Sequence, residues 1–241
     1  MLPRILEPET LDHLAPDDPA ACRARRDLRR VNRVMGAKGI LKRALARVVP
    51  RSPRPPDSPL RVIELGCGDG RLMLDVARSS RSPLGAAEIT LLDLQSIVTP
   101  ETFAAYAAAG WQARSLSQDV LTWAEGDAGD DRWDLVVANL FLHHFEGEAL
   151  RLLLAGCARR ADAIAVCEPR RSRFALDASH LVVFLGANAV TRRDAVLSVR
   201  AGFIDDELEQ AWPDRSGAWQ LEEYEDGPFT HCFCARRREP R

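Results

Sequence analysis

One carboxylate and three closely spaced glycines form the part of this sequence that is best suited to chemistry. Glu64 ends an apolar run, and Gly66, Gly68 and Gly70 follow at alternate positions before an apolar helical pattern begins at Leu72. Glycine allows positive φ angles and lets a ligand approach the backbone closely. A strand that ends in such a turn leaves free N–H groups at the start of the next helix, where polar ligands bind. The segment therefore predicts a backbone cradle for a cofactor.

Further polar residues follow other apolar runs. Asp93 ends the run 89–93, Asp119 follows a predicted strand at 112–117, and Asn139 ends a predicted strand at 134–139. Open α/β sheets bind ligands at the carboxyl ends of their strands, so these side chains are candidates for the same site. The glycine spacing differs from the Gly-x-Gly-x-x-Gly of dinucleotide-binding loops, which argues against a nicotinamide dehydrogenase.

The segment from Glu64 to Gly70 resembles the first motif of class I S-adenosylmethionine-dependent methyltransferases, and Asp93, Asp119 and the run 134–145 resemble later elements of that family in order. The resemblance covers roughly residues 60–170. It implies S-adenosyl-L-methionine as cofactor, with S-adenosyl-L-homocysteine as product. Asp93 would hold the ribose hydroxyls, Asp119 would lie beside the adenine amino group, and Glu64 would meet the ammonium group. The implied cofactor-binding residues are Glu64, Gly66, Cys67, Gly68, Gly70, Asp93, Leu94, Asp119, Val120 and Asn139.

Two adjacent histidines, His143 and His144, follow the predicted strand at 134–139. The ordinary pKa of histidine lies near neutral pH, so either side chain is a candidate to take a proton from an acceptor hydroxyl during methyl transfer. In the alternative interpretation, one histidine fills a helix–sheet junction and the other lines the cofactor pocket without acid–base work. Glu168, which follows the next predicted strand, is expected at the same edge of the sheet.

The alternation of strands and helices predicts an α/β fold, a Rossmann-like, doubly wound sheet with helices on both faces. The family resemblance implies seven strands with the last one antiparallel. A capping box at Thr191 and Asp194 predicts the start of a late helix. The predicted strands are 60–65, 88–93, 112–117, 134–139, 162–167, 218–225 and 229–236, and the predicted core helices are 70–79, 100–109, 147–159, 174–187, 192–201 and 205–211.

The pattern divides the chain into two predicted parts. Residues 1–59 form an N-terminal helical cap, with helices near 19–35 and 39–49 and a proline-rich linker at 50–59. Residues 60–241 form the methyltransferase core, with a helical insertion at about 172–212. The cap and the insertion are expected to build an apolar acceptor pocket from some of Leu28, Val31, Met35, Phe174, Leu181, Phe184 and Leu185.

Charge and cysteine content limit the partners that we expect. The 33 basic and 35 acidic residues give a formal net charge of -2, which does not favour binding to nucleic acid or anionic membranes. The arginine-rich N-terminal helix is interpreted as a solvated face. No apolar run approaches membrane-spanning length, and the six cysteines lack metal-site spacing. We therefore expect a cytoplasmic protein with reduced thiols and no metal, either a monomer or a homodimer.

The leading hypothesis is a methyltransferase that acts on a small, aromatic or apolar acceptor at oxygen or carbon, by in-line displacement in a capped pocket. One alternative is an RNA or protein methyltransferase that uses its basic N-terminal helices to bind the substrate. Another alternative is a methyltransferase-like partner subunit without catalytic activity.

Overall fold

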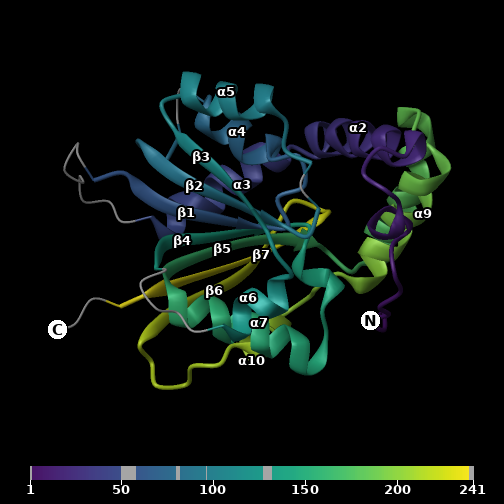
Figure 1. Ribbon diagram of the computed structural model, residues 1–241. Coiled ribbons are helices and arrows are strands. Elements are labelled where there is room, and N and C mark those ends of the chain that lie inside the picture. Colours follow the sequence, from purple (N-terminus) through teal and green to yellow (C-terminus); the bar gives the residue numbers. More distant parts are fainter. Residues whose placement is uncertain (1, 50–57, 80–81, 96, 127–131, 239–241) are drawn as a thin grey trace.

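The computed structural model describes residues 2–49, 58–79, 82–95, 97–126 and 132–238. Its centre is a seven-stranded sheet with the order β3-β2-β1-β4-β5-β7-β6 (Figure 1). Strands β1 to β5 are parallel, and β7 runs antiparallel between β5 and β6. This arrangement confirms the predicted fold class. The strands are β1 (Leu60–Leu65), β2 (Ala87–Asp93), β3 (Gln112–Ser117), β4 (Trp133–Asn139), β5 (Ala161–Pro169), β6 (Trp219–Asp226) and β7 (Thr230–Arg237).

Side chains alternate across the central strand β1, so one strand contributes to two apolar cores. Val62 packs in the core beneath α3 (Ala37–Val48), α4 (Arg71–Ala77) and α5 (Pro100–Ala108), whereas Ile63 and Leu65 pack in the core on the opposite face. Figure 1 shows these two helical layers on either side of the sheet. The second layer contains α6 (Val120–Glu125), α7 (Gly147–Arg160) and α10 (Glu207–Ala211).

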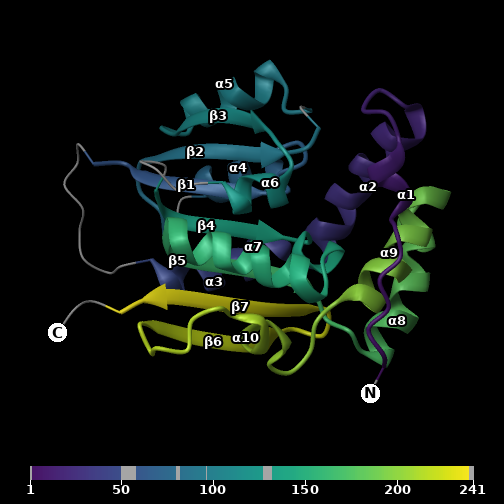
Figure 2. The ribbon, with the colours of Figure 1, turned by 60° about the horizontal axis from the view of Figure 1, so that its bottom comes forward.

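A third group of helices stands at the end of the sheet where the parallel strands finish (Figure 2). It combines N-terminal helices with the insertion that follows β5, and α2 and α9 are in contact. Helix α2 begins as predicted at Pro19, behind Asp18, whose carboxylate accepts the N–H of Ala20 at 2.6 Å. The group consists of α1 (Thr10–His13), α2 (Pro19–Val34), α8 (Arg173–Ser179), the 3-10 helix η2 (His180–Leu185) and α9 (Ala189–Ala201).

The insertion differs from the prediction in two places. The expected helix at 174–187 is an α-helix up to Ser179 and then a 3-10 helix, which ends at Gly186 with a φ of 73°. Helix α9 starts before the predicted capping box, because the Asn188 side chain already caps it by accepting the N–H of Thr191 at 2.9 Å. Asp194 is therefore inside the helix and free to bond elsewhere.

Two short helices, α1 and α6, had no counterpart in the prediction. They have four and six residues, too few for a periodic apolar pattern to be visible. Most of the predicted linker, residues 50–57, lies outside the described residues, and the division of the chain after residue 59 stays a prediction. No helix in the described part of the chain is long and apolar enough to cross a membrane.

Candidate active site

A cavity of about 1040 Å³ opens at the carboxyl ends of the parallel strands, below the third group of helices. Its wall includes residues from the glycine turn, from the ends of β2 and β4, and from α2. The structure therefore brings together most of the residues that the sequence singled out. The predicted residues in the wall are Glu64, Gly66, Cys67, Gly68, Asp93, Leu94, Asp119, Val120, Asn139, His143 and His144.

The first two glycines shape the cradle in different ways. Gly66 has a φ of 64°, and a Cβ added there would lie 2.1 Å from Cδ2 of Phe141. Gly68 has a φ of 53° and open space around its Cα, and its N–H donates to Asp93 Oδ2 at 2.8 Å. Gly66 thus permits close packing of the loop after β4, whereas Gly68 joins the glycine turn to the end of β2.

Gly70 has a structural role in the turn and does not belong to the cavity wall. It precedes α4 with a φ of 68°, and its carbonyl accepts the hydroxyl of the buried Tyr106 at 2.7 Å. An added Cβ would lie 3.0 Å from a methyl group of Leu91. Its direct contact with a cofactor, expected from the sequence, stays a prediction.

Glu64 is buried at the base of the cradle without compensation for its charge. Its Oε2 has no hydrogen-bond partner among the residues that the structure describes. Burial, helped by the nearby charges of Asp69 and Asp93, raises the pKa of Glu64 to about 8. An unsatisfied buried carboxyl group is unfavourable, and an ammonium group beside it would supply both a donor and a positive charge. The cradle therefore fits the amino acid end of S-adenosylmethionine.

The residues that the sequence predicts for the nucleoside end lie in the same cavity wall. Asp93 accepts the N–H groups of Gly68 and Gln95 at 2.8 and 2.9 Å, one on each oxygen. Each oxygen retains a lone pair, which suits a ribose hydroxyl. Leu94 is 69% exposed and offers an apolar surface in the cavity wall. Asp119 caps α6 by accepting the N–H of Thr122 at 2.8 Å, so this aspartate has a structural task whether or not it meets adenine.

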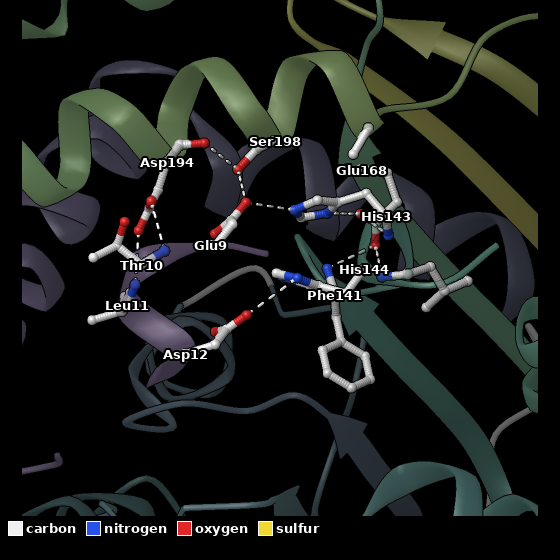
Figure 3. A network of polar contacts seen from close by, with 12 residues as sticks. Glu9, Thr10, Leu11, Asp12, Phe141, His143, His144, Glu168, Asp194 and Ser198 are labelled. Atoms are coloured by element: carbon white, nitrogen blue, oxygen red, sulfur yellow. Dashed lines mark hydrogen bonds and ion pairs between the residues drawn. The ribbon is translucent and has the colours of Figure 1, made fainter. Parts of the chain in front are cut away.

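The loop after β4 is held by one fully buried carboxylate (Figure 3). Leu140 has a positive φ of 53°, an unfavourable conformation for leucine, and the next residues turn their N–H groups toward Glu168. Glu168 Oε1 accepts from Phe141 and Leu142 at 3.0 and 2.8 Å. Glu168 is therefore the acceptor that allows this loop to bend under the cavity.

His143 lies between two carboxylates. Its Nδ1 is 2.7 Å from Glu168 Oε2, and its Nε2 is 3.3 Å from Glu9 Oε1. Burial disfavours the imidazolium, but the hydrogen bonds with Glu168 and Glu9 outweigh it and raise the pKa of His143 to about 9. Both ring nitrogens already have partners, so this histidine connects the loop after β4 to the N-terminal segment.

His144 has a different environment, although the two rings lie only 4.3 Å apart. Its Nδ1 is 3.4 Å from Asp12 Oδ2, and the side chain is partly exposed to the cavity. Burial and the neighbouring charge of His143 lower the pKa of His144. Among the residues that the structure describes, no second carboxylate pairs with this ring.

The segment that carries Glu9 and Asp12 is anchored to α9, as Figure 3 shows. Asp194 accepts the N–H groups of Thr10 and Leu11, both at 2.9 Å, and Ser198 donates to Glu9. Sequence reasoning missed Glu9 and Asp12, because the first 17 residues contain no recognisable motif. Their carboxylates become significant only where α9 holds them against the histidine pair.

Two arginines in the cavity wall, one from α2 and one from α3, have acidic partners. Arg29 pairs with Asp69 at 2.6 Å, and Arg43 forms two hydrogen bonds with Asp226 at 2.7 and 2.8 Å. These contacts use the guanidinium groups to hold the cap on the core. They favour the interpretation of the basic helices as a structural, solvated face over a phosphate-binding surface.

Comparison with known proteins agrees with this geometry. Residues 62–162 match the family described as methyltransferase domain. No curated protein sequence matches the chain. Among solved structures, the plantazolicin methyltransferase BpumL in complex with S-adenosylhomocysteine is similar, with 12% identity, a TM-score of 0.61 and coverage of 92% of each chain. An O-methyltransferase family protein from Burkholderia thailandensis has 16% identity and a TM-score of 0.59, over 92% of this chain and 61% of that one.

The domain match over residues 62–162, the strand order and the cradle together support a class I S-adenosylmethionine-dependent methyltransferase. The similar structures extend over the helical cap as well as the sheet. A second plantazolicin methyltransferase, BamL, aligns over 95% of this chain with 11% identity and a TM-score of 0.59. At such low identity the solved structures establish the fold alone, and the acceptor has to be argued from the cavity.

Proposed function

We propose that this enzyme transfers the methyl group of S-adenosylmethionine to a small aromatic or apolar acceptor, at a hydroxyl oxygen or a carbon atom. The observation that carries the proposal is a cavity whose wall contains both an unpartnered buried carboxyl group, Glu64, and His144 with the aromatic ring of Phe141 next to it. One end of this cavity suits a charged amino acid, and the other suits an uncharged ring.

On the donor side, the chain would hold the cofactor with Glu64, the amides of the glycine turn and Asp93. The cofactor supplies a methyl group on a positively charged sulfur. The protein's contribution is to fix that group in line with the acceptor atom and to exclude water, and positioning of this kind accounts for a large part of the rate enhancement.

For the acceptor, the cavity wall offers apolar and aromatic side chains among charged and polar ones. Of the candidates from the sequence, Leu28 and Met35 line the cavity, whereas Phe174, Leu181 and Phe184 are 62%, 57% and 82% exposed and are absent from its wall. The loop after β4 and the β6–β7 turn supply aromatic rings instead. The apolar part of the lining includes Leu28, Met35, Ile40, Phe141, Phe145 and Phe229.

The two histidines would have separate tasks. His143, with both nitrogens on carboxylates, positions the loop and the N-terminal segment. His144 lies in the cavity wall and pairs with no second carboxylate among the described residues, so it would receive the proton of a hydroxyl acceptor while Asp12 orients its ring.

Ligand binding tests the donor side. We expect S-adenosylhomocysteine to raise the melting temperature of the full chain, and nicotinamide dinucleotides to leave it unchanged. A response to the dinucleotides alone would overturn the proposal.

Incubation with isotopically labelled S-adenosylmethionine and a panel of phenols, other aromatic acceptors, RNA and peptides then tests the acceptor class. Labelling of RNA or peptide alone would favour the alternative substrates, and no labelling at all would favour a non-catalytic subunit.

Substitution tests the histidines once an acceptor is known. His144→Ala should lower kcat strongly and leave the affinity for S-adenosylhomocysteine unchanged, because His144 would act on the acceptor. His143→Ala should lower kcat through displacement of the loop and the N-terminal segment. Full activity in both variants would show that positioning by other residues suffices.

A further inference from the structure

We propose that Glu9, His143 and His144 form a binding site for one first-row transition-metal dication at the edge of the cavity. Each of the three side chains offers one donor atom, and these atoms all lie within 4.8 Å of one another. They come from two distant segments that meet only in the folded chain, as Figure 3 shows. The sequence alone predicted no metal.

The separation of the donor atoms suits a shared ion. Two ligands that each lie about 2.1 Å from a metal at a tetrahedral angle are about 3.4 Å apart. Glu9 Oε1 and His143 Nε2 are separated by 3.3 Å. A cation could therefore replace the proton between them with little movement of either side chain.

The surroundings of the two imidazoles have the form that metal-binding histidines usually have. A metal-ligating histidine uses its second nitrogen to bond to a carboxylate or carbonyl, which fixes the ring and its tautomer. Glu168 holds Nδ1 of His143 at 2.7 Å, and Asp12 lies 3.4 Å from Nδ1 of His144. Each ring is thus oriented by one carboxylate, and Nε2 of His143 already points at Glu9, the third residue of the cluster.

The donor set also indicates the kind of ion. Two imidazoles and one carboxylate suit zinc, iron, cobalt or manganese, whereas magnesium and calcium prefer oxygen ligands alone. Three protein ligands leave a coordination position open, as in catalytic zinc sites. All three residues line the proposed acceptor cavity, so an acceptor bound there would lie near the ion.

This inference deepens the proposed function and rests on it for the role of the ion. A hydroxyl acceptor at the open position would have a lowered pKa and would release its proton to solvent as it binds, before methyl transfer. Its oxygen would form the bond to the methyl carbon, and the electron pair of the broken carbon–sulfur bond would stay on sulfur. In this scheme the cation, and not His144, would promote the loss of the proton from the acceptor hydroxyl.

Binding of Co²⁺ alone tests the site without any acceptor. The full chain, free of any polyhistidine tag and treated with a chelator, is titrated with Co²⁺ while visible absorption is recorded, and Zn²⁺ is then added as a competitor. We expect one equivalent of Co²⁺ with the bands of a site of low coordination number, displaced by one equivalent of Zn²⁺. Absence of saturable binding would overturn the inference.

Variants show whether the ion occupies these residues. Glu9→Gln and His144→Ala should each weaken Co²⁺ binding at least about 100-fold, and Glu168→Gln about 10- to 100-fold. The control His180→Gln alters an exposed histidine outside the cluster and should bind Co²⁺ like the parent chain. Unchanged binding in Glu9→Gln and His144→Ala would place the ion elsewhere and refute the site.

The same samples separate this inference from the proposed function. Every variant is also tested for S-adenosylhomocysteine binding by thermal shift, which does not depend on the metal cluster. Cofactor binding without Co²⁺ binding would refute the metal site alone. If the unsubstituted chain does not bind S-adenosylhomocysteine, the proposed function is refuted, whatever the result with Co²⁺.

Discussion

The two ends of the cavity are built by different means. At the donor end, Glu64, Gly66 and Gly68 belong to one short segment, and the turn is held mainly by backbone conformation and by a hydrogen bond to Asp93. At the proposed acceptor end, the loop after β4 is joined by side-chain contacts to Glu168 and to the distant Glu9.

This difference has a physical consequence. A glycine turn needs particular φ angles, so a substitution that changes those angles acts directly on the cradle. The histidine pair depends instead on buried charges that satisfy one another, so removal of one partner leaves another without compensation. The donor end should therefore respond to changes in backbone freedom, and the acceptor end to changes in charge.

Removal of the Glu168 carboxylate is the strongest test of the acceptor end. Glu168→Ala would leave the N–H groups of Phe141 and Leu142 and the ring of His143 without their buried acceptor. We expect the free energy of unfolding to fall by about 3–5 kcal/mol, measured by urea denaturation. The control Glu148→Ala, at an exposed position of α7, should change it by less than about 0.5 kcal/mol. A loss for Glu168→Ala as small as that of the control would contradict this account.

At the donor end, Gly66 and Gly68 have similar φ angles. Substituting each by alanine therefore separates the cost of conformational strain from the cost of steric overlap. Gly68→Ala should cost about 1–2 kcal/mol, because alanine disfavours a φ of 53° but meets open space. Gly66→Ala adds overlap with Phe141 and should cost about 2–4 kcal/mol. Urea denaturation gives the two values, and calorimetry gives the affinity for S-adenosylhomocysteine. Equal effects at both positions would show that the ring of Phe141 moves away freely.

Asp93 tests how far cofactor binding depends on a single strand-end carboxylate. Asp93→Ala removes the acceptor for the N–H groups of Gly68 and Gln95 and the proposed acceptor for ribose hydroxyls. The affinity for S-adenosylhomocysteine should fall about 10- to 100-fold, as expected for hydrogen bonds to a charged group. Glu88→Ala, at the exposed opposite end of β2, is the matched control. Unchanged affinity for Asp93→Ala would remove Asp93 from the site.

The last test concerns one proton at Glu64. Its pKa is raised to about 8 from an ordinary value near 4.5, so the folded chain keeps a proton that the unfolded chain has lost between these pH values. Stability should therefore fall as pH rises from 4.5 through 8, and Glu64→Gln should flatten this dependence.

Cofactor binding provides a second measurement of the same proton. An ammonium group beside Glu64 would lower its pKa and release the proton at pH 7. Calorimetry in buffers of different ionisation enthalpy should show release of close to one proton on binding of S-adenosylhomocysteine, and none with Glu64→Gln. Equal proton release in both proteins would place the ammonium group elsewhere.

The sequence predicted the glycine turn of the cavity better than the side-chain contacts around the histidine pair. The glycine turn and Asp93 were predictable, because strand ends and positive φ angles are properties of short segments. The start of α9 was not, since the Thr191–Asp194 pattern competes with a better cap at Asn188. Asp194 then holds the N-terminal segment, a role that no local pattern reveals.

By itself, the sequence determined the sheet and its order along the chain, the cradle at Glu64 and the presence of a histidine pair beyond β4. These features follow from apolar periodicity and from the conformational freedom of glycine, which act over a few neighbouring residues. Only the tertiary structure decided that His143 lies between Glu168 and Glu9 and that His144 meets Asp12. The reason is that a buried carboxylate selects its partners by position in space, and the packing of α9 against α1 sets that position.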